Sequence, residues 1–325
     1  MKRVTVIATA SAAAISILSI ALVNHGAWSQ PTRTIKIVVP TAPGGTTDIL
    51  ARLLGEQIAR TQAATVVIDN RPGAGEIIGT ESVARAAPDG NTLLFTANPF
   101  VINPNWRKVN YHPVTSFESI CLLVTSPPLI VVNSTSPYRT LAELLDAARA
   151  KPGTISLGSI GPGSNFHLGF EQLKIAAKVD MTFVPYPGNG PAVNALLGGH
   201  VTMMFATYGN VAEHLKAGRL RALAAGTQTR IEMLPDLPTV AESGFKDYEV
   251  KGWFGTFAPA KTPKDTVAQL AGWFTAAMQA PEVKAKLDVQ GLFPAGICGA
   301  DFTAYVRSQF EDYGRIIREA NVKAE

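Results

Sequence analysis

The stretch that decides the fold is IKIVVPTAPGGTTD, residues 35–48. Its first five residues are mostly apolar and β-branched, which predicts a strand over residues 35–39. Gly44 and Gly45 follow, and a helix is predicted over residues 47–60. The apolar side chains of this helix recur at helical spacing: Leu50, Leu53, Leu54 and Ile58. A strand, a glycine turn and an amphipathic helix therefore follow one another directly.

The same alternation continues along the chain. Further strands are predicted over residues 65–68, 92–96, 129–132, 155–158, 181–185, 201–205 and 220–224. Helices are predicted over residues 140–150, 164–177, 190–198 and 208–217. Strands that alternate with helices predict parallel sheets covered on both faces, and hence an α/β protein with two lobes. The segments 264–279, 281–290 and 300–320 are predicted to be helical without an obvious strand, so they are expected to pack on a sheet built elsewhere.

Length and composition are those of a globular protein. The chain has 325 residues, of which 46% are hydrophobic and 17% charged, and this excludes a disordered or highly charged protein. The length favours one large or two medium domains. The formal net charge is only +4 and there is no basic run, so the sequence gives no reason to expect nucleic acid as a partner.

The first 29 residues have the pattern of a secretory signal peptide. Met1-Lys2-Arg3 is positively charged, residues 4–23 are apolar or small, and Ala27-Trp28-Ser29 is a small-x-small cleavage site. A membrane anchor is the alternative, because a run of about 20 apolar residues can cross a bilayer. Small residues dilute this run and the cleavage site follows promptly, so we expect export with cleavage and a mature protein in the periplasm.

Two cysteines, Cys121 and Cys298, are the only ones in the chain. An exported protein could pair them, but they lack CxxC spacing, so buried thiols and a disulfide are equally compatible with the sequence. The five histidines, one of them in the leader, form no metal-binding pattern. We expect neither a metal nor another cofactor.

The loop at residues 44–48 is the first candidate binding site. Open α/β sheets bind ligands at the carboxyl ends of strands, where helix N-termini present free N–H groups and the positive end of the helix dipole to an anion. The alternative is a plain turn with a threonine N-cap. The candidate residues are Gly44, Gly45, Thr46, Thr47 and Asp48.

A second glycine-rich loop, residues 158–167, also joins a strand to a helix. Its candidate residues are Ser159, Gly163, Ser164, Asn165 and His167. His167 falls in the first helical turn, where the dipole disfavours an imidazolium. A neutral ring that forms a hydrogen bond within the loop is the favoured interpretation, and direct ligand contact is the other. Ser164 and His167 are also the one pair that could serve an exported hydrolase, although no orienting acid is evident.

Two such helix starts, one in each lobe, could hold one anion from two sides. Hydrogen bonds to charged groups contribute about 1.5–3 kcal/mol each, so three or four fit micromolar or tighter binding without an arginine. Tyr186, in a third strand-to-helix loop over residues 184–191, is expected either to wall the pocket or to be a structural aromatic. The sequence lacks a GxSxG elbow, a Walker A loop, HExxH and a complete GxGxxG, so catalysis is not expected.

Seven segments, taken together and in order, resemble the Bug-type solute receptors of tripartite tricarboxylate transporters. They are residues 43–48 (PGGTTD), 70–75 (NRPGAG), 86–90 (AAPDG), 184–186 (VPY), 196–201 (LLGGHV), 237–242 (LPTVAE) and 253–255 (WFG). The resemblance covers essentially all of the chain after the leader.

The resemblance implies two Rossmann-like α/β lobes with a ligand cleft between them, as in type II periplasmic binding proteins. We expect residues 30–131 and 252–325 in one lobe and residues 132–251 in the other. The cleft would close by a hinge motion over a small carboxylate held by both loops, with Thr207 as a further contact. A monomeric receptor would then deliver its ligand to a membrane permease of the same system. A sensor that presents its closed state to a signalling partner is an alternative.

The chain departs from the pattern of this family at two places. Many relatives carry a glycine and an asparagine where this chain has Glu76 and Ile77, and many carry an aspartate at the position of Ala206. Loss of that aspartate removes a polar anchor, so we expect a ligand without an amino group.

Overall fold

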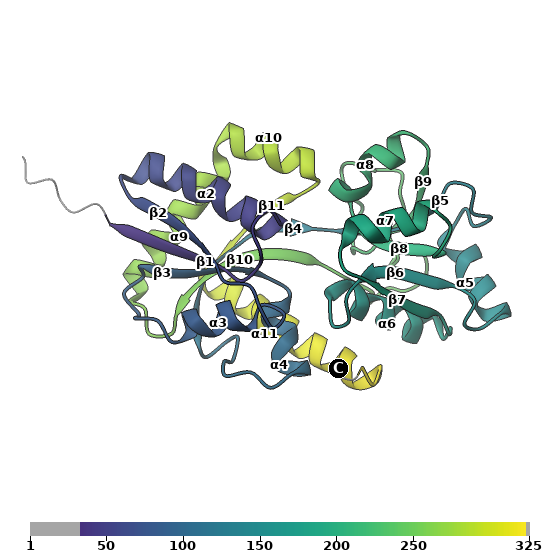
Figure 1. Ribbon diagram of the computed structural model, residues 1–325, viewed down its shortest axis with the longest axis horizontal. Coiled ribbons are helices and arrows are strands. Elements are labelled where there is room, and N and C mark those ends of the chain that lie inside the picture. The colour runs from purple at the N-terminus through teal and green to yellow at the C-terminus, as the bar shows by residue number, and fades with distance from the viewer. Residues whose placement is uncertain (1–32, 323–325) are drawn as a thin grey trace, which may run out of the picture. The chain divides into compact units, whose positions relative to one another are not determined.

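Two sheets, one of six strands and one of five, organise residues 33–322, the part of the chain that the computed structural model describes (Figure 1). The predicted leader, residues 1–29, lies outside the described residues. None of the described helices is both long and apolar enough to span a bilayer.

The first sheet has the strand order β11-β4-β10-β3-β1-β2. Its strands are β1 (Thr34–Val39), β2 (Thr65–Asn70), β3 (Thr92–Ala97), β4 (Phe117–Ser126), β10 (Gly252–Pro259) and β11 (Phe293–Cys298). The strand β1 pairs parallel with β2 and β3, whereas β10 pairs antiparallel with both β3 and β4. The edge strand β11 is antiparallel to β4.

The second sheet has the order β7-β6-β8-β5-β9. Its strands are β5 (Pro128–Asn133), β6 (Ser156–Ile160), β7 (Thr182–Tyr186), β8 (Met203–Thr207) and β9 (Leu220–Ala225). The strand β6 is parallel to β7 and β8, and β5 is antiparallel to β8 and β9.

The expectation of parallel sheets is correct only in part, because both sheets also contain antiparallel pairs. The reason lies in the connections between the sheets. A single residue, Pro127, separates β4 of the first sheet from β5 of the second, so no crossover helix turns the chain back into a parallel strand. The returning strand β10 likewise enters the first sheet antiparallel to its neighbours. The strand β11, which lies between the predicted helical segments 281–290 and 300–320, was also not predicted.

Helices cover both faces of each sheet (Figure 1). The first sheet carries α2 (Thr46–Gln62), α9 (Lys264–Gln279) and α10 (Pro281–Gln290) on one face, and α3 (Ile77–Ala84), α4 (Pro99–Trp106) and α11 (Gly299–Glu319) on the other. The second sheet carries α5 (Leu141–Ala150) and α6 (Asn165–Ala177) on one face, and α7 (Asn189–Leu197) and α8 (Tyr208–Lys216) on the other. We call the first sheet with its helices the first lobe and the second sheet with its helices the second lobe.

The burial pattern of α2 explains why residues 46–62 form a helix. All four of its periodic apolar residues, Leu50, Leu53, Leu54 and Ile58, are buried in one core cluster with β1. Burying a leucine or isoleucine side chain stabilises the fold by about 1.5–3 kcal/mol. Packing therefore fixes the start of α2 at the carboxyl end of β1.

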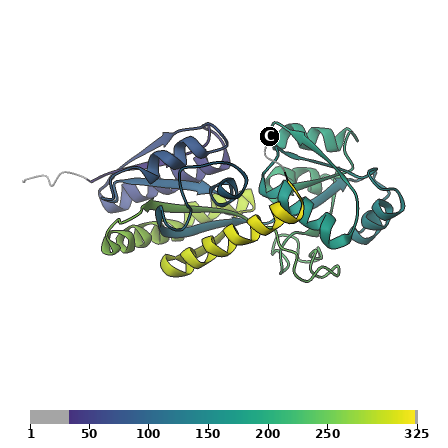
Figure 2. The same ribbon diagram turned by 90° about the horizontal axis from the view of Figure 1, so that it is seen from below.

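Contacts between the lobes come mainly from the C-terminal part of the chain. In the view from below, α11 (yellow) runs along the first lobe, and it contacts α6 of the second lobe (Figure 2). Leu168 of α6 is buried in the same apolar cluster as Trp253 and Phe302.

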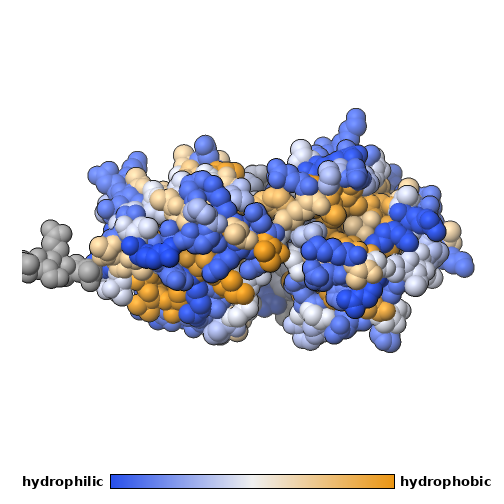
Figure 3. All heavy atoms as spheres, turned by 90° about the horizontal axis from the view of Figure 1, so that it is seen from above, coloured by the Kyte–Doolittle hydropathy of each residue, from blue (hydrophilic) through white to orange (hydrophobic). Residues whose placement is uncertain are grey.

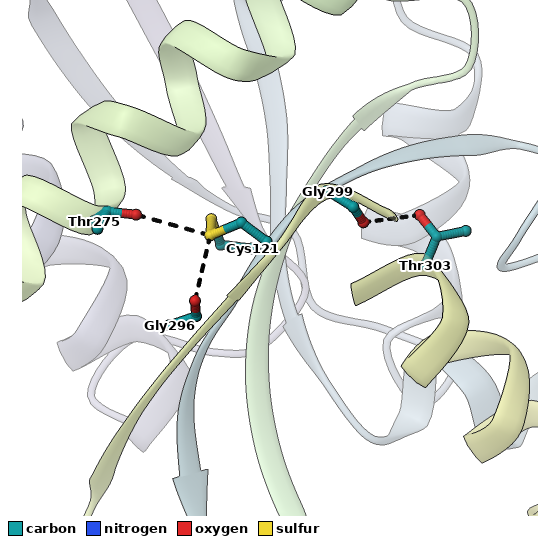
Figure 4. The surroundings of a disulfide bond; sticks show 6 residues. Cys121, Thr275, Gly296, Gly299 and Thr303 are labelled. Carbon is teal, nitrogen blue, oxygen red and sulfur yellow. Dashed lines mark hydrogen bonds between the residues drawn. A yellow bond between two sulfur atoms is a disulfide. The ribbon is translucent and has the colours of Figure 1, made fainter. Parts of the chain in front are cut away.

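Cys121 and Cys298 form a disulfide, which settles the alternative that the sequence left open. Cys121 on β4 lies opposite Cys298 at the end of β11, so the bond ties the edge strand of the first sheet to its neighbour. Thr275 of α9 lies beside it, with its hydroxyl 3.7 Å from the Cys298 sulfur (Figure 4).

Candidate functional site

A cavity of about 490 Å³ lies between the lobes and is lined from both. The chain passes between the lobes at the end of β4 and again at the start of β10. These two crossing strands contribute Ser126, Gly252 and Phe254 to the cavity. A larger hollow, of about 800 Å³ around residues 139–142 and 233–238, is lined by the second lobe alone. A second cavity, of about 450 Å³, is also lined from both lobes, by Thr125 and Phe293 on one side and residues 227–232 on the other, but none of the described helices begins at it. A closing motion of the lobes could seal the cavity of about 490 Å³. Figure 3 shows a furrow between the two lobes on the face seen from above.

The beginnings of six helices meet at this cavity. Each contributes its N-cap or a residue of its first turn: Thr46 of α2, Glu76 of α3, Asn98 of α4, Ser164 of α6, Asn189 of α7 and Thr207 of α8. The first N–H groups of a helix lack intrahelical partners and carry the positive end of its dipole. No side chain caps α2, α7 or α8. The arrangement suits an oxygen-rich anion.

In the first predicted loop, Thr46 lines the cavity, and Gly44 and Gly45 are exposed beside it. Gly45 is the N-cap of α2. A side-chain carbon built on Gly45 would meet no atom closer than 3.9 Å, so the approach to the first amides of α2 is open. Thr47 is buried and does not line the cavity.

The side chain of Asp48 holds this loop in place through hydrogen bonds. Its side chain accepts hydrogen bonds from the Gly44 amide at 2.9 Å, the Arg52 guanidinium at 3.0 Å and the Asn70 side-chain amide at 2.9 Å. Burial acts to raise the pKa of Asp48, but these hydrogen bonds outweigh it and lower the pKa. Asp48 is only 3% exposed, so it holds the loop in shape and does not reach the cavity.

In the second predicted loop, Ser164 and Asn165 line the cavity. The Ser164 hydroxyl caps α6 by accepting from the His167 amide at 3.2 Å, and it donates to the Ile160 carbonyl at 3.0 Å. His167 is buried, and its Nδ1 accepts from the Gly163 amide at 3.1 Å. Burial, aided by the charge of Lys174, lowers the pKa of His167 to about 4. At neutral pH His167 is therefore a neutral group that closes its own loop.

Three other predicted residues are not at the cavity lining. Ser159 is fully buried in β6, and Tyr186 packs against the apolar cluster of the second lobe. Gly163 contacts the first lobe instead, because a side-chain carbon there would lie 2.1 Å from the Trp106 ring. Thr207, in contrast, lines the cavity as predicted.

The sequence prediction missed six lining residues with polar side chains: Glu76, Asn98, Ser126, Asn189, Asn210 and Gln290. Asn189 lies within the loop 184–191 in which we singled out Tyr186, and it is the first residue of α7, so its place at a helix start was a usable signal. Asn98 stabilises the start of β10. Its side chain donates a hydrogen bond to the Lys251 carbonyl at 2.8 Å and accepts one from the Trp253 amide at 3.2 Å. Nothing local distinguishes Ser126, whose hydroxyl is buried at the cavity without a hydrogen-bond partner.

Glu76 is the one ionisable side chain among the described residues that line the cavity. Its carboxylate accepts a hydrogen bond from the Thr96 hydroxyl at 3.0 Å. Burial raises the pKa of Glu76 to about 7, against the lowering effect of that hydrogen bond. The backbone of Glu76 has a φ of 78°, in the left-handed region.

The described residues contain no group of three or more histidine, cysteine or acidic residues that could hold a metal ion. Ser164 and His167 do not form a nucleophile–base pair either. No hydrogen bond joins the Ser164 hydroxyl to the His167 ring in the part of the chain that the structure covers, because Nδ1 is used by Gly163.

Comparison with known proteins gives consistent results. Residues 50–322 match the model of the tripartite tricarboxylate transporter family receptor. A UPF0065 protein from the tcbD-tcbE intergenic region of a Pseudomonas strain is 36% identical over 296 residues, covering 90% of this chain and 88% of the relative.

Solved structures agree in fold. The periplasmic binding protein BugD is 35% identical with a TM-score of 0.76, covering 91% of this chain and 100% of that one. The R. palustris protein Rpa4515, solved with adipate, is 31% identical with a TM-score of 0.78, covering 90% of this chain and 99% of that one.

Proposed function

Because this chain belongs to the tripartite tricarboxylate transporter receptor family, as its motifs predicted, we propose that it is a periplasmic receptor for a small organic carboxylate. It captures the ligand in the interlobe cavity, closes over it and delivers it to a membrane permease of the same system. It acts as a monomer and catalyses no reaction.

The observation that carries this proposal is the convergence of helix starts on one cavity. Uncapped N-termini of α2, α7 and α8 face it, and the unpartnered hydroxyl of Ser126 is buried at its wall. An unsatisfied buried polar group costs about 1–3 kcal/mol, which a polar ligand would recover. Three or four hydrogen bonds from such donors to a carboxylate support binding at micromolar concentrations.

The bound adipate of Rpa4515 supports a carboxylate ligand for this receptor. Closure of the cavity also requires the lobes to move about their crossing segments. The predicted limits of the lobes, residues 131/132 and 251/252, stay a proposal. They lie near Pro127 and near Gly252, the first residue of β10. The hydrolase alternative gains no support, because the Ser164 and His167 side chains are bonded to their own loop.

The substitution Gly45→Glu tests the proposal. The position has a φ of −76° and open space around it, so the variant is expected to fold. A glutamate there would place a negative charge and bulk over the first amides of α2. We expect at least a tenfold loss of affinity for any carboxylate that raises the melting temperature of the wild type, on the order of 1.4 kcal/mol or more.

The measurement is a thermal-shift screen of carboxylates followed by calorimetry. Gly272→Glu, at an exposed and open position on α9 away from the cavity, is the control for adding a glutamate. Unchanged affinity in Gly45→Glu would show that the ligand does not use this loop.

A further inference from the structure

Glu76 is an acidic group inside a cavity whose other described lining residues are neutral. No described lysine, arginine or histidine forms an ion pair with it, and its carboxylate has the hydrogen bond from Thr96 alone. Glu76 is half-buried, and a carboxylate withdrawn from water with so little compensation keeps its proton more readily, which is why its pKa is raised to about 7.

The backbone conformation of Glu76 also destabilises the fold, in addition to the desolvation of its carboxylate. Its φ of 78° belongs to the left-handed region, which glycine adopts freely and a glutamate does not. This chain therefore carries a strained and desolvated acid at a position where glycine would relieve both costs, and groups of this kind concentrate at functional sites.

We propose that Glu76 makes this receptor selective for a monocarboxylate whose far end carries a cationic nitrogen, and that it excludes dicarboxylates; this rests on the proposed function. The helix starts hold the carboxylate of the ligand, and Glu76 accepts hydrogen bonds from the nitrogen. A second carboxylate in the same cavity would face Glu76, and like charges at close range in a poorly solvated site repel strongly.

This inference replaces the expectation of a ligand without an amino group. That expectation came from Ala206 alone. Ala206 is fully buried in the apolar cluster of the second lobe and does not line the cavity. Glu76 supplies a carboxylate from the opposite lobe, so an anchor for a cationic group is present after all.

Matched probes separate the two ligand classes at constant length. Calorimetry at about pH 8, above the raised pKa of Glu76, would compare adipate, 6-aminohexanoate and hexanoate, and then succinate, 4-aminobutanoate and butanoate. At the length that fits, we expect the wild type to bind the amino acid about tenfold or more tightly than the diacid.

Two variants remove the charge of Glu76. In Glu76→Gln and in Glu76→Gly the preference for the amino acid over the diacid should fall by about tenfold or more. Glu56→Gln, an exposed position on α2 outside the cavity, should keep the preference of the wild type. The melting temperature of Glu76→Gly should equal or exceed that of the wild type, because glycine relieves the strain.

Several results would overturn the inference. Tighter binding of the diacid by the wild type, an unchanged preference in both Glu76 variants, or a marked fall in the melting temperature of Glu76→Gly would each do so. The last would show that the fold keeps Glu76 for stability. Binding of hexanoate or butanoate without any preference for the amino acid leaves the carboxylate receptor intact and removes this inference alone. If no probe binds to any variant, the proposed function itself fails.

Discussion

At the scale of single residues, the polar side chains of the two predicted loops mostly serve the loops. Asp48 binds the amide of Gly44, and His167 binds the amide of Gly163, each four residues back along the chain. Both hold a glycine turn in the shape that presents neighbouring groups, Thr46 and Asn165, to the cavity. Aspartate and histidine suit ligand binding, but the same side chains also stabilise a loop by accepting hydrogen bonds from its backbone amides.

The lowered pKa of His167 predicts a loss of stability in acid. The unfolded chain takes up a proton below its ordinary pKa of about 6.5, whereas the folded protein does so only near pH 4. Stability should therefore fall as the pH drops from about 6.5 to 4, by about 3 kcal/mol in total. Lys174 on the same helix adds to the effect, and Glu171, 3.9 Å from Nε2, opposes it.

The substitution His167→Gln removes this titration. Urea unfolding at about pH 7, 5.5 and 4.5 should show the difference in stability moving in favour of the variant as the pH falls. The exposed His200→Gln is the matched control for the loss of a histidine. A parallel pH dependence in wild type and His167→Gln would contradict the prediction.

At the scale of elements, glycines allow the helix starts of one lobe to approach the other lobe closely. A side-chain carbon on Gly209, in the first turn of α8, would lie 2.5 Å from the carbonyl oxygen of Gln290 at the end of α10. Gly291 makes the reverse contact with Tyr208. Gly209 and Gln290 both line the cavity, so this contact forms one edge of it.

The substitution Gly209→Ala should therefore hinder closure without straining the helix. Steric conflicts of this kind cost about 1–3 kcal/mol, so we expect about a tenfold loss of ligand affinity. Gly190→Ala, at the corresponding second position of α7, meets no atom within 4 Å and is the control. Equal affinities of the two variants, measured by calorimetry, would argue against the closure contact.

At the scale of the whole molecule, segments that are distant in sequence are held together by one disulfide bond and by the two chain connections between the lobes. The disulfide joins Cys121 and Cys298 across 177 residues of sequence, a span that contains the whole second lobe. It therefore restricts the unfolded chain over more than half of the length that the structure describes.

Removing the disulfide should destabilise the protein by about 2–5 kcal/mol. The double variant Cys121→Ala with Cys298→Ala, unfolded in urea, measures the loss. Dithiothreitol should lower the melting temperature of the wild type and leave that of the double variant unchanged. A wild type that is insensitive to the reductant would contradict a stabilising role for the bond.

The sequence determined the local elements, because hydrophobic periodicity and glycine turns act over a few residues. It predicted α2 and its loop, the helix starting at Asn165 and most strands to within about two residues. It also determined the family, since seven ordered motifs require no geometry. Only the tertiary structure decided that both sheets are mixed, that the cysteines pair, and that Glu76, Ser126 and Asn189 share one cavity. The physical reason is that these features depend on contacts between residues far apart in the chain, and no local pattern records which helix starts will point at the same space.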